Sequence, residues 1–416
     1  MLVVVSMVRA LSALAVLVGA HAAAPPWYTR FGTSARRSWA VGGTGAVTNK
    51  LAWATPLNCS TYASPLLDDS DGSVFMVDSA CGRGFNADGK ERWSTPFLSS
   101  CYGTAQPTLV PGGVIQIGCT SCGLIAGAFA SNGSIAWHSF TNAAAVGPTL
   151  LLQSNLTFIP LWDFSLPAIS AGGASPFSWG LPYAPAGTLA QDSAGHVYAL
   201  TPSLQSGNPL GTMLHAWDER SRTVLWTAAL PSLDGESISA GIVVSEDEAL
   251  VYWAATTMDS TDGKLSWVLH AASTSNGSVV WSAHSPPGTQ CTGFATPAAG
   301  PRGALYSMWS ESAPGSVAVI VAAFDGLSGE QRWRVVVGPA DGTTTTFGVA
   351  VDAAGAVLAF ASTVGVALNG TTGTRLFNFP LNTGAARFTS SPAVRGDGAL
   401  FVASNTALLA FDGRPL

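Results

Sequence analysis

The side chains with the most distinctive chemistry in this chain are its six cysteines, an even number that favours disulfide bridges in an exported protein. Three of them stand six residues before a repeated proline, at Pro65, Pro107 and Pro297. The other three follow the second strand expected in the first two repeat units. In that order, the cysteines are Cys59, Cys101 and Cys291, then Cys81, Cys119 and Cys122.

Equivalent positions in the repeats predict how four of these cysteines pair. One bridge, Cys59–Cys81, would staple the first repeat unit. The equivalent bridge in the second unit would be Cys101–Cys122. Both bridges would brace loops on the same face of the molecule, because equivalent positions of a repeat occupy equivalent places in the fold.

Cys119 and Cys291 are then left, and they could pair only if their loops meet over the mouth of a central channel. An alternative is a redox pair between Cys119 and Cys122, which have the Cys-x-x-Cys spacing. No strand–helix–strand pattern surrounds that motif, so we favour structural bridges.

Five Asn-x-Ser/Thr sequences offer sites for N-glycosylation. Three of them sit in the Gly turn before a repeated aromatic residue, where a glycan would face solvent. Asn-Gly is also good turn chemistry, and both explanations can hold together. The predicted acceptors are Asn58, Asn132, Asn155, Asn276 and Asn369.

Residues 1–22 predict a secretory signal, because a single cation precedes a short apolar core and a small-x-small end at residues 20–22. The alternative is an uncleaved anchor, since residues 1–6 extend the apolar stretch, but Arg9 interrupts it. We therefore expect a protein that is secreted or lies in the lumen of the secretory pathway, with no membrane span once the signal is removed.

The elements that must position these groups are repeated strands. Six stretches share one spacing, a small residue followed nine or ten positions later by an aromatic, and a seventh that ends at Trp179 is degenerate. A repeat period of about 40 to 55 residues, filled with β-branched residues and Gly, predicts a β-propeller. The repeated aromatics are Trp93, Trp137, Trp226, Trp281, Trp333 and Phe377.

Each unit predicts a blade of four antiparallel strands, in which the third strand carries the small residue and the fourth carries the aromatic. Eight inner-strand starts predict eight blades. The last unit lacks an aromatic strand, whereas Trp53 has no blade before it. Residues 48–56 should therefore complete the blade of residues 390–412, which removes two exposed sheet edges. This places the propeller domain at 48–416, after an N-terminal extension at 23–47.

The small-x-Asp-x-x-x-Gly-x-x-x-Trp pattern is most faithful from Ala323 to Trp333. It resembles the tryptophan-docking repeat of the quinoprotein (pyrroloquinoline-quinone dehydrogenase-like) eight-bladed propellers, over nearly the whole mature chain. The resemblance implies an all-β fold in which each aromatic locks two blades by packing on its neighbour's Gly turn. The same repeat occurs in propellers that bind no quinone, so it indicates the fold more strongly than the function.

For an enzyme, the resemblance implies a Ca²⁺ held by carboxylate and amide side chains, a base Asp, and two adjacent cysteines beside the quinone. This chain has no adjacent cysteines, and no acidic residue stands at the inner-strand starts, which surround the upper channel mouth. We therefore expect no cofactor and no metal, with pyrroloquinoline quinone and Ca²⁺ as the alternative. The expected channel-mouth residues are Ser64, Gln106, Thr188, Ser239, Thr296 and Ser391.

The acidic residues gather instead at hairpin turns, notably 68–71, 246–248 and Asp397. The first of these resembles part of a calcium loop, but Leu67 takes the opening ligand position, so we expect a turn. A net charge of -6 and a single adjacent basic pair disfavour nucleic-acid binding. With 47% hydrophobic residues, 10% charged residues and 46 Gly, the composition fits one β-domain.

These observations favour a non-catalytic binding or scaffold propeller, whose disulfide-braced upper face holds a protein, a glycan or a small ligand. The alternative is a divergent quinone-dependent oxidoreductase, which the family resemblance alone supports. A structural wall or matrix protein would fit the glycosylation sequences but has no positive signal.

Overall fold

The computed structural model describes the propeller. The predicted signal, most of the predicted N-terminal extension and several loops lie outside the described residues. Cys59, Cys81, Cys101, Asn58 and Ser239 fall outside as well. The described residues are 45–57, 64–77, 82–95, 106–145, 149–181, 186–202, 212–230, 237–238, 241–258, 265–286, 289–313, 316–340, 346–381 and 386–415.

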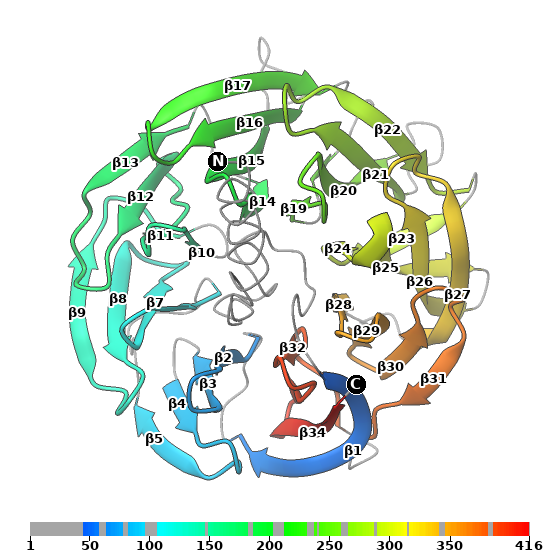
Figure 1. Cartoon of the computed structure of the whole chain (residues 1–416), viewed down its shortest axis with the longest axis horizontal. Coiled ribbons are helices and arrows are strands. Elements are labelled where there is room, and N and C mark those ends of the chain that lie inside the picture. The colour runs from blue at the N-terminus through cyan, green and yellow to red at the C-terminus, as the bar shows by residue number, and fades with distance from the viewer. Residues whose placement is uncertain are drawn as a thin grey trace, which may run out of the picture.

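Eight antiparallel sheets stand around a common centre, each with its first strand nearest the centre and its last strand at the rim (Figure 1). The predicted all-β, eight-bladed propeller is therefore confirmed. We call the four strand positions of each blade A to D, from the centre outward, and number the blades from the first complete one.

Blades 1 to 4 each contain four strands. Blade 1 consists of β2 (Leu66–Asp68), β3 (Ser73–Val77), β4 (Gly82–Phe85) and β5 (Glu91–Thr95). Blade 2 consists of β6 (Thr108–Val110), β7 (Val114–Gly118), β8 (Leu124–Phe129) and β9 (Ile135–Phe140). Blade 3 consists of β10 (Leu150–Leu151), β11 (Thr157–Phe158), β12 (Ser165–Ile169) and β13 (Phe177–Gly180). Blade 4 consists of β14 (Ala186–Gln191), β15 (His196–Pro202), β16 (Thr212–Asp218) and β17 (Thr223–Leu230).

In blades 5 and 6 the inner strand is split in two. Blade 5 consists of β18 (Ser237–Ile238), β19 (Val243–Val244), β20 (Leu250–Met258), β21 (Leu265–Ser273) and β22 (Val279–His284). Blade 6 consists of β23 (Gln290–Phe294), β24 (Ala298–Ala299), the 3-10 turn η1 (Pro301–Gly303), β25 (Ala304–Ala313), β26 (Ser316–Asp325) and β27 (Gln331–Ala340). Blade 7 consists of β28 (Thr346–Val351), β29 (Ala356–Ala361), β30 (Val364–Asn369) and β31 (Arg375–Asn378).

The N-terminal strand closes the ring, as the sequence predicted. Blade 8 consists of β32 (Ala393–Val394), β33 (Leu400–Ala403), β34 (Ala407–Pro415) and, at its rim, β1 (Gly45–Pro56). Trp53 lies opposite Ala410 in this sheet. Its indole donates a hydrogen bond to the carbonyl of Ala87 in blade 1 at 2.9 Å, so the last blade is locked to the first. The strand begins at Gly45, slightly before the predicted domain start.

The register between strands C and D explains the spacing of small and aromatic residues. Ala323 lies directly opposite Trp333, and Gly84 lies opposite Trp93. A Cβ atom built on Gly84 would lie 2.4 Å from the indole nitrogen of Trp93, so a larger residue would displace the ring. In blade 2 the residue opposite Trp137 is Gly127, one position before the alanine that the repeat predicted.

Each docking indole reaches the C–D turn of the next blade. The Trp333 Nε1 donates to the carbonyl of Gly370 at 2.9 Å, and its ring covers Gly373, whose φ of +71° suits only glycine well. Trp93 and Trp281 are buried, whereas Trp137, Trp226 and Trp333 are half-buried. Blade-to-blade locking by these residues is thus part of the fold.

Blade 3 lacks this lock, in agreement with its degenerate repeat. Trp179 stacks on Trp217 of blade 4, with ring centroids 5.5 Å apart and planes 22° from parallel. The residue with positive φ in the blade 4 turn is Arg222, at +60°, rather than a glycine. Its guanidinium covers the ring of Phe177 at 4.4 Å, so an arginine side chain occupies the docking position here.

Candidate functional site

The polar residues predicted for the channel mouth lie at the inner-strand starts, and those that the structure describes are buried between blades except for Thr296, which is half-buried. The Ser64 N–H donates to Gln106 Oε1 at 2.9 Å, and Gln106 Nε2 donates back to the Ser64 carbonyl at 3.0 Å. Gln106 then accepts, through its own carbonyl, a 2.9 Å hydrogen bond from the Thr149 hydroxyl of blade 3. These side chains join neighbouring blades.

The same pattern continues around the ring. Thr188 is buried and donates to the Ile242 carbonyl of blade 5 at 3.5 Å, while the Gly241 N–H donates to Thr296 Oγ1 of blade 6 at 3.0 Å. Ser391 is buried against blade 7, close to Gly348. The described members therefore stand at the inner-strand starts, as predicted, and their hydrogen bonds run to neighbouring blades.

A quinone and a Ca²⁺ ion would need acidic ligands at this end of the propeller, and the described residues do not fit them. The hydroxyl and amide groups there are neutral, and the side chains of Gln106, Thr188 and Thr296 bond the neighbouring blades. Within the described ranges, no three His, Cys, Asp or Glu side chains come together as a metal site would need. We therefore derive no catalytic step through either group.

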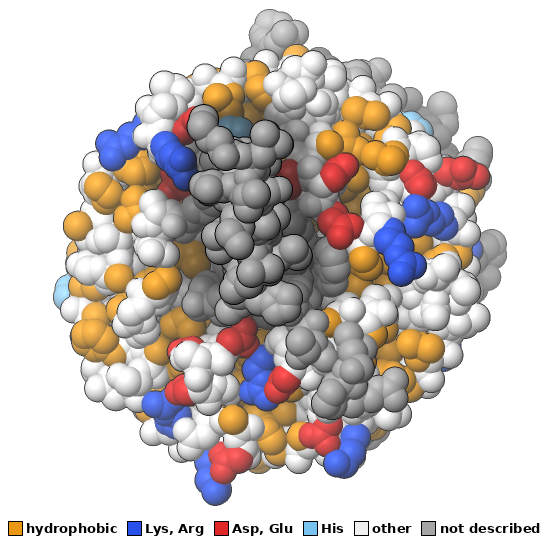
Figure 2. Space-filling view, viewed as in Figure 1, with side chains coloured by type: hydrophobic (Ala, Val, Ile, Leu, Met, Phe, Trp, Pro, Cys, Tyr) orange, Lys and Arg blue, Asp and Glu red, His pale blue; other side chains and the backbone are white. Residues whose placement is uncertain are grey.

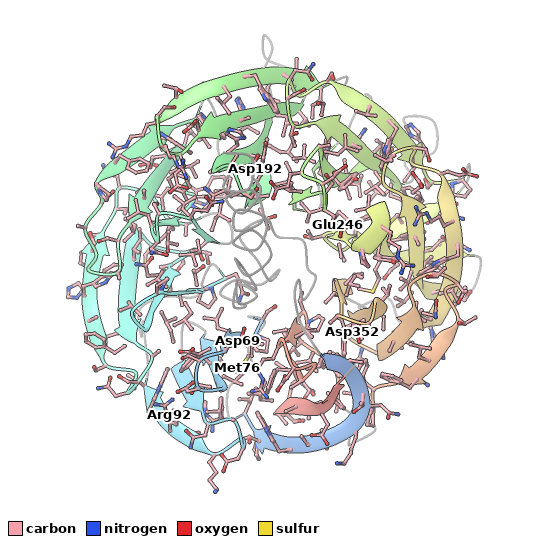
Figure 3. The ribbon with its side chains drawn as sticks, in the orientation of Figure 1. Asp69, Met76, Arg92, Asp192, Glu246 and Asp352 are labelled. Carbon is pink, nitrogen blue, oxygen red and sulfur yellow. The ribbon has the colours of Figure 1, made fainter. Side chains whose placement is uncertain are left out.

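The acidic turns lie at the opposite end, where strands A and B meet; we call this the lower face. Figure 3 labels Asp69, Asp192, Glu246 and Asp352 around the centre, and Figure 2, in the same orientation, shows acidic and basic side chains interspersed there. The predicted turn at 68–71 is bonded as a turn, with Asp68 Oδ1 accepting from the Ser70 N–H at 3.0 Å.

Asp192, His196 and Tyr198 form a hydrogen-bonded cluster of residue types that also occur in catalytic sites. Asp192 Oδ2 lies 2.8 Å from His196 Nδ1 and accepts a 2.8 Å hydrogen bond from the Tyr198 hydroxyl. However, Asp192 Oδ1 also accepts from the backbone N–H four residues later, and Asp352 of blade 7 does the same toward Ala356. The shared geometry identifies Asp192 as a cap of the hairpin turn.

The cysteines of blade 2 do not pair as predicted. Cys119 follows β7, is fully buried and is disulfide-bonded. Cys122, in the same turn, is a partly exposed free thiol, so the predicted Cys101–Cys122 bridge is wrong, and so is the redox pair with Cys119. The two thiols differ in environment, because Cys119 is fully buried and its backbone bonds Leu124 and Ala145, whereas Cys122 is partly exposed.

Cys291 does not pair with Cys119 either. It lies in β23 of blade 6 and packs in a hydrophobic cluster with Trp267 and Trp309, whereas Cys119 packs among residues of blades 1 and 2. The two loops do not meet over the channel. The predicted Cys59–Cys81 bridge concerns residues outside the described part of the chain.

Four of the predicted glycan acceptors can be placed. Asn132, Asn155 and Asn276 lie in exposed turns, and Asn369 is half-buried. The Oδ1 atoms of Asn132, Asn276 and Asn369 accept hydrogen bonds from backbone N–H groups in their turns. A glycan joins the other side-chain atom, Nδ2, so turn formation and glycosylation are compatible at these positions.

A groove with a volume of about 320 Å³ lies between blades 2 and 3 and extends from the upper face, where the inner strands start, to the C–D turn of blade 3. Trp137 lies at its base, with Nε1 donating to the Ala171 carbonyl at 2.7 Å. Phe140, Asn142 and Asp163 line it from the connection between the blades and from the B–C turn of blade 3. We call this cavity the blade 2/3 groove.

Two large aromatic side chains are exposed at the blade 2/3 groove. Phe140 lines the groove and is 78% exposed, whereas Trp162 lies outside the lining, in the same turn as Asp163, and is 61% exposed. The turn is fixed, because the Trp162 N–H donates to the Ala144 carbonyl at 3.0 Å and Ala145 bridges to Leu161. Exposed aromatics on a fixed backbone are typical of binding surfaces.

Polar groups beside these aromatics are open to a ligand. The hydroxyl of Ser139 and the side-chain amide of Asn142 have no hydrogen-bond partner within the described ranges. Asp163 accepts from Ser165 through Oδ1, at 2.6 Å from its hydroxyl, which leaves Oδ2 available. The sequence analysis missed this site, although aromatics that stand outside the docking positions, such as Phe140, were a usable signal.

Comparisons with known proteins support the fold. A family model described as outer membrane protein assembly factor BamB matches residues 317–415, from β26 to the end of β34. No curated protein matches the chain. This match covers only the C-terminal part of the chain, and it agrees with the resemblance of the repeat to the PQQ-like, eight-bladed propellers.

The solved structures that resemble this fold belong to proteins of different kinds. BamB from Moraxella catarrhalis is 16% identical over 88% of this chain and 97% of its own, with a TM-score of 0.59. Quinohemoprotein alcohol dehydrogenase from Comamonas testosteroni is 12% identical over 95% and 82%, with a TM-score of 0.64. The C-terminal WD40 domain of Sif2 is 10% identical over 87% and 98%, with a TM-score of 0.61. Identities this low show a shared fold alone.

Among the residues that the structure describes, no helix is long and apolar enough to cross a membrane.

Proposed function

We propose that this chain is a non-catalytic binding propeller of the secretory route that holds a neutral carbohydrate chain in the blade 2/3 groove. The observation that carries the proposal is the pairing of two aromatics that line the groove, the exposed Phe140 and the half-buried Trp137, with open polar groups on a fixed backbone. The predicted signal at 1–22 and the glycosylation sequences support a secretory location.

The chemistry of the groove favours a saccharide. The C–H face of a pyranose ring is apolar and flat, so it packs on an aromatic ring such as Phe140. The hydroxyls around the ring both donate and accept, which suits the carboxylate of Asp163 and the amide of Asn142. No Lys or Arg lines the groove, so its residues give an anionic ligand no ion pair. A volume of about 320 Å³ suits a small part of a chain.

The proposal is tested by titrating the purified protein with neutral oligosaccharides of glucose, xylose, mannose and N-acetylglucosamine. Trp137 and Trp162 report on the groove, so intrinsic fluorescence is the readout. We expect one series to bind saturably and Phe140→Ala to weaken it about tenfold, the size of one lost aromatic contact.

Leu327→Ala is the matched control, because Leu327 is 65% exposed in a turn of blade 6, far from the groove. Its affinity should equal that of the unchanged protein. The proposal would be overturned if none of the four oligosaccharide series bound saturably, or if both substitutions weakened binding equally. A protein would then be the next ligand to test for the groove.

The alternative function is that of a divergent quinone-dependent oxidoreductase, because the fold is similar to that of a quinohemoprotein alcohol dehydrogenase. It is tested by adding pyrroloquinoline quinone and Ca²⁺ to the full chain and following dye reduction with alcohols. Stoichiometric quinone binding with turnover would replace the binding-module proposal. The expected result is neither, because the described residues at the upper channel end offer no acidic ligands.

A further inference from the structure

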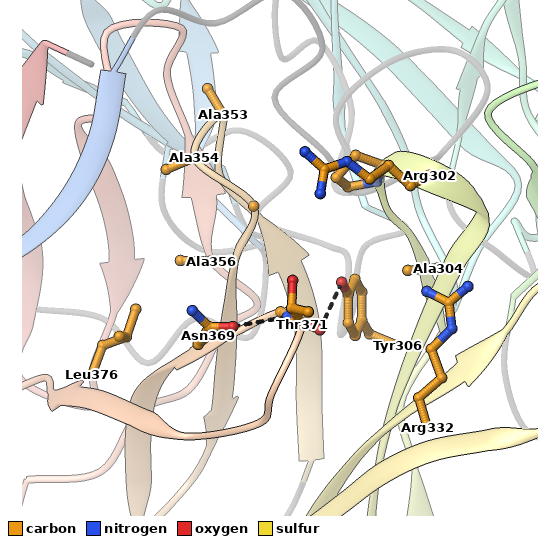
Figure 4. A pocket seen from close by; sticks show the side chains of 13 residues that line it. Arg302, Ala304, Tyr306, Arg332, Ala353, Ala354, Ala356, Asn369, Thr371 and Leu376 are labelled. Carbon is orange, nitrogen blue, oxygen red and sulfur yellow. Dashed lines mark hydrogen bonds between the residues drawn. The ribbon is translucent and has the colours of Figure 1, made fainter.

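A second cavity, of about 390 Å³, opens on the lower face between blades 6 and 7, remote from the blade 2/3 groove. Arg302, Tyr306 and Arg332 form its blade 6 wall, and residues 353–355 and 369–371 form its blade 7 wall (Figure 4). We call it the blade 6/7 cavity.

The cavity has a rigid floor. The Tyr306 hydroxyl donates to the Gly370 carbonyl at 3.2 Å, and Trp333 donates to the same carbonyl at 2.9 Å. Gly370 also approaches Gly355 so closely that a Cβ atom on Gly370 would lie 2.3 Å from the Gly355 carbonyl oxygen. The two walls are therefore held together before any ligand arrives.

Two arginines reach this cavity from different elements. Arg302 belongs to η1, where its φ is +59°, and its backbone N–H donates to Glu246 Oε2 at 2.7 Å. Its exposed guanidinium has no hydrogen-bond or ion-pair partner in the described part of the chain. Its charge is thus available to a ligand, while its backbone is anchored.

Arg332, from β27, supplies the second positive charge. One of its nitrogens bonds Asp325 at 2.7 Å, and its side chain is 39% exposed. A guanidinium has five N–H donors, so most of its donors stay available. Asp325, bonded to Arg332, and Glu246, bonded to the Arg302 backbone, balance the two arginine charges, so the cavity offers guanidinium donors rather than a net positive charge. The hydroxyl of Thr371 stands on the opposite wall with no hydrogen-bond partner among the described residues.

Two other junctions, as far as the structure describes them, differ from this arrangement. In blade 1, Arg92 also precedes a docking tryptophan, but it bonds Asp71 at 3.0 Å and Ser73 at 2.6 Å. In blade 5, the turn equivalent to η1 carries Glu246 in place of an arginine. The docking repeat therefore does not require the pair of arginines at blades 6 and 7.

We propose that the blade 6/7 cavity binds the oxyanion of a small molecule, a phosphate or a carboxylate, between the guanidiniums of Arg302 and Arg332. The planar fork of arginine matches both groups with two parallel hydrogen bonds. The volume suits a metabolite-sized ligand rather than a macromolecule. This site is independent of the saccharide groove.

The test is isothermal titration calorimetry of the full chain at low ionic strength, with inorganic phosphate, sulfate, acetate and succinate as separate probes. We expect saturable binding of at least one probe. Phosphate and sulfate binding alone would identify a phosphate-type ligand, and acetate or succinate binding alone would identify a carboxylate. Because Asn369 borders the cavity, the protein is made in a host without N-glycosylation.

Arg302→Gln should weaken the bound probe about tenfold, the size of a lost charged hydrogen bond. Arg302→Lys should weaken it less, because it keeps the charge and loses the fork. Arg92→Gln is the matched control and should leave the affinity unchanged, since Arg92 lies in another blade. Unchanged melting temperatures would show that all three variants fold.

Absence of saturable binding by all four probes would overturn the proposal. Equal weakening by Arg302→Gln and Arg92→Gln would also overturn it, because that result would reflect overall surface charge. Neither outcome affects the saccharide titration, so the two proposals fail separately.

Discussion

The junction between blades 5 and 6 and the junction between blades 6 and 7 are built on the same clamp. In the first, Tyr252 and Trp281 both donate to the Gly326 carbonyl, at 3.2 and 2.8 Å. In the second, the Tyr–Trp pair of blade 6 does the same toward Gly370. The two clamps are repeat equivalents, and they fix the spacing between neighbouring blades.

The junctions differ in what stands around the clamp. At blades 5 and 6 the hairpin turn is acidic, with Glu246 in it, and Val280 precedes the docking tryptophan. At blades 6 and 7 the corresponding residues are Arg302 and Arg332, and a cavity opens between the walls. The residues that repeat therefore determine the architecture, and those that depart from the repeat give each junction its chemistry.

The largest expected effect is loss of a clamp tryptophan. Trp281→Ala should lower the free energy of unfolding by about 4 kcal/mol, and Trp333→Ala by about 3 kcal/mol, through lost burial and a cavity. The smaller value follows because Trp333 is half-buried whereas Trp281 is buried. Urea unfolding followed by circular dichroism measures both.

Leu376→Ala serves as the control, because Leu376 is 50% exposed and should change stability by less than about 0.5 kcal/mol. If Trp333→Ala unfolded like the unchanged protein but lost oxyanion binding, the tryptophan would be part of the site rather than of the lock. The two junctions would then differ in more than their charges.

A smaller effect is expected from the clamp tyrosines. Tyr252→Phe and Tyr306→Phe each remove a hydroxyl from a buried hydrogen bond, and each should cost about 1 kcal/mol. The Gly carbonyl keeps its bond from the tryptophan, so it is not left unsatisfied. Equal losses in thermal melts would show that the clamps are equivalent, whereas a larger loss at Tyr306 would indicate that the blade 6/7 cavity depends on it.

The sequence predicted the clamp tryptophans well because their constraint is local. A small residue in strand C and an aromatic in strand D lie opposite each other within one blade, so their spacing is fixed by the length of one turn, as for Ala323 and Trp333. Closure by the strand of Trp53 followed from the missing partner in the last unit. Both rest on pairing that a repeat shows directly.

The candidate sites were not predictable in the same way, because their residues meet across blades. Arg302 and Thr371 are brought together only when blades 6 and 7 dock, and no spacing within one repeat reports it. The sequence also did not show how the polar residues at the inner-strand starts are bonded, because Gln106 bonds Ser64 of the neighbouring blade. The pairing predicted for Cys122 was wrong because the sequence does not show that Cys119, three residues earlier, is the buried and bonded member of the two.

The smallest expected effects on stability concern two aspartates whose pKa values are shifted in opposite directions. One lies in the blade 1 turn and the other beside the blade 6/7 cavity. Burial raises the pKa of Asp69, in the blade 1 turn, to about 6; Arg395 opposes this, and Asp397 and Asp68 add to it. The hydrogen bond from Arg332 lowers the pKa of Asp325, beside the blade 6/7 cavity, to about 2.

The two shifts predict opposite pH dependence of stability. The carboxyl group of Asp69 does not lower the free energy of unfolding below pH about 3.8, and it becomes destabilising as the pH rises through about 6. Asp69→Asn should therefore stabilise the protein at pH 7.5 and not at pH 3.5. Asp325 stabilises above pH about 4 and loses that contribution as the pH falls through about 2, so Asp325→Asn should destabilise at pH 7.5. Both side chains are partly open to solvent, so each change should be no more than about 1 kcal/mol. Urea unfolding at both pH values measures the two variants, and a loss of stability in Asp69→Asn at pH 7.5 would show that Arg395 outweighs burial in the blade 1 turn.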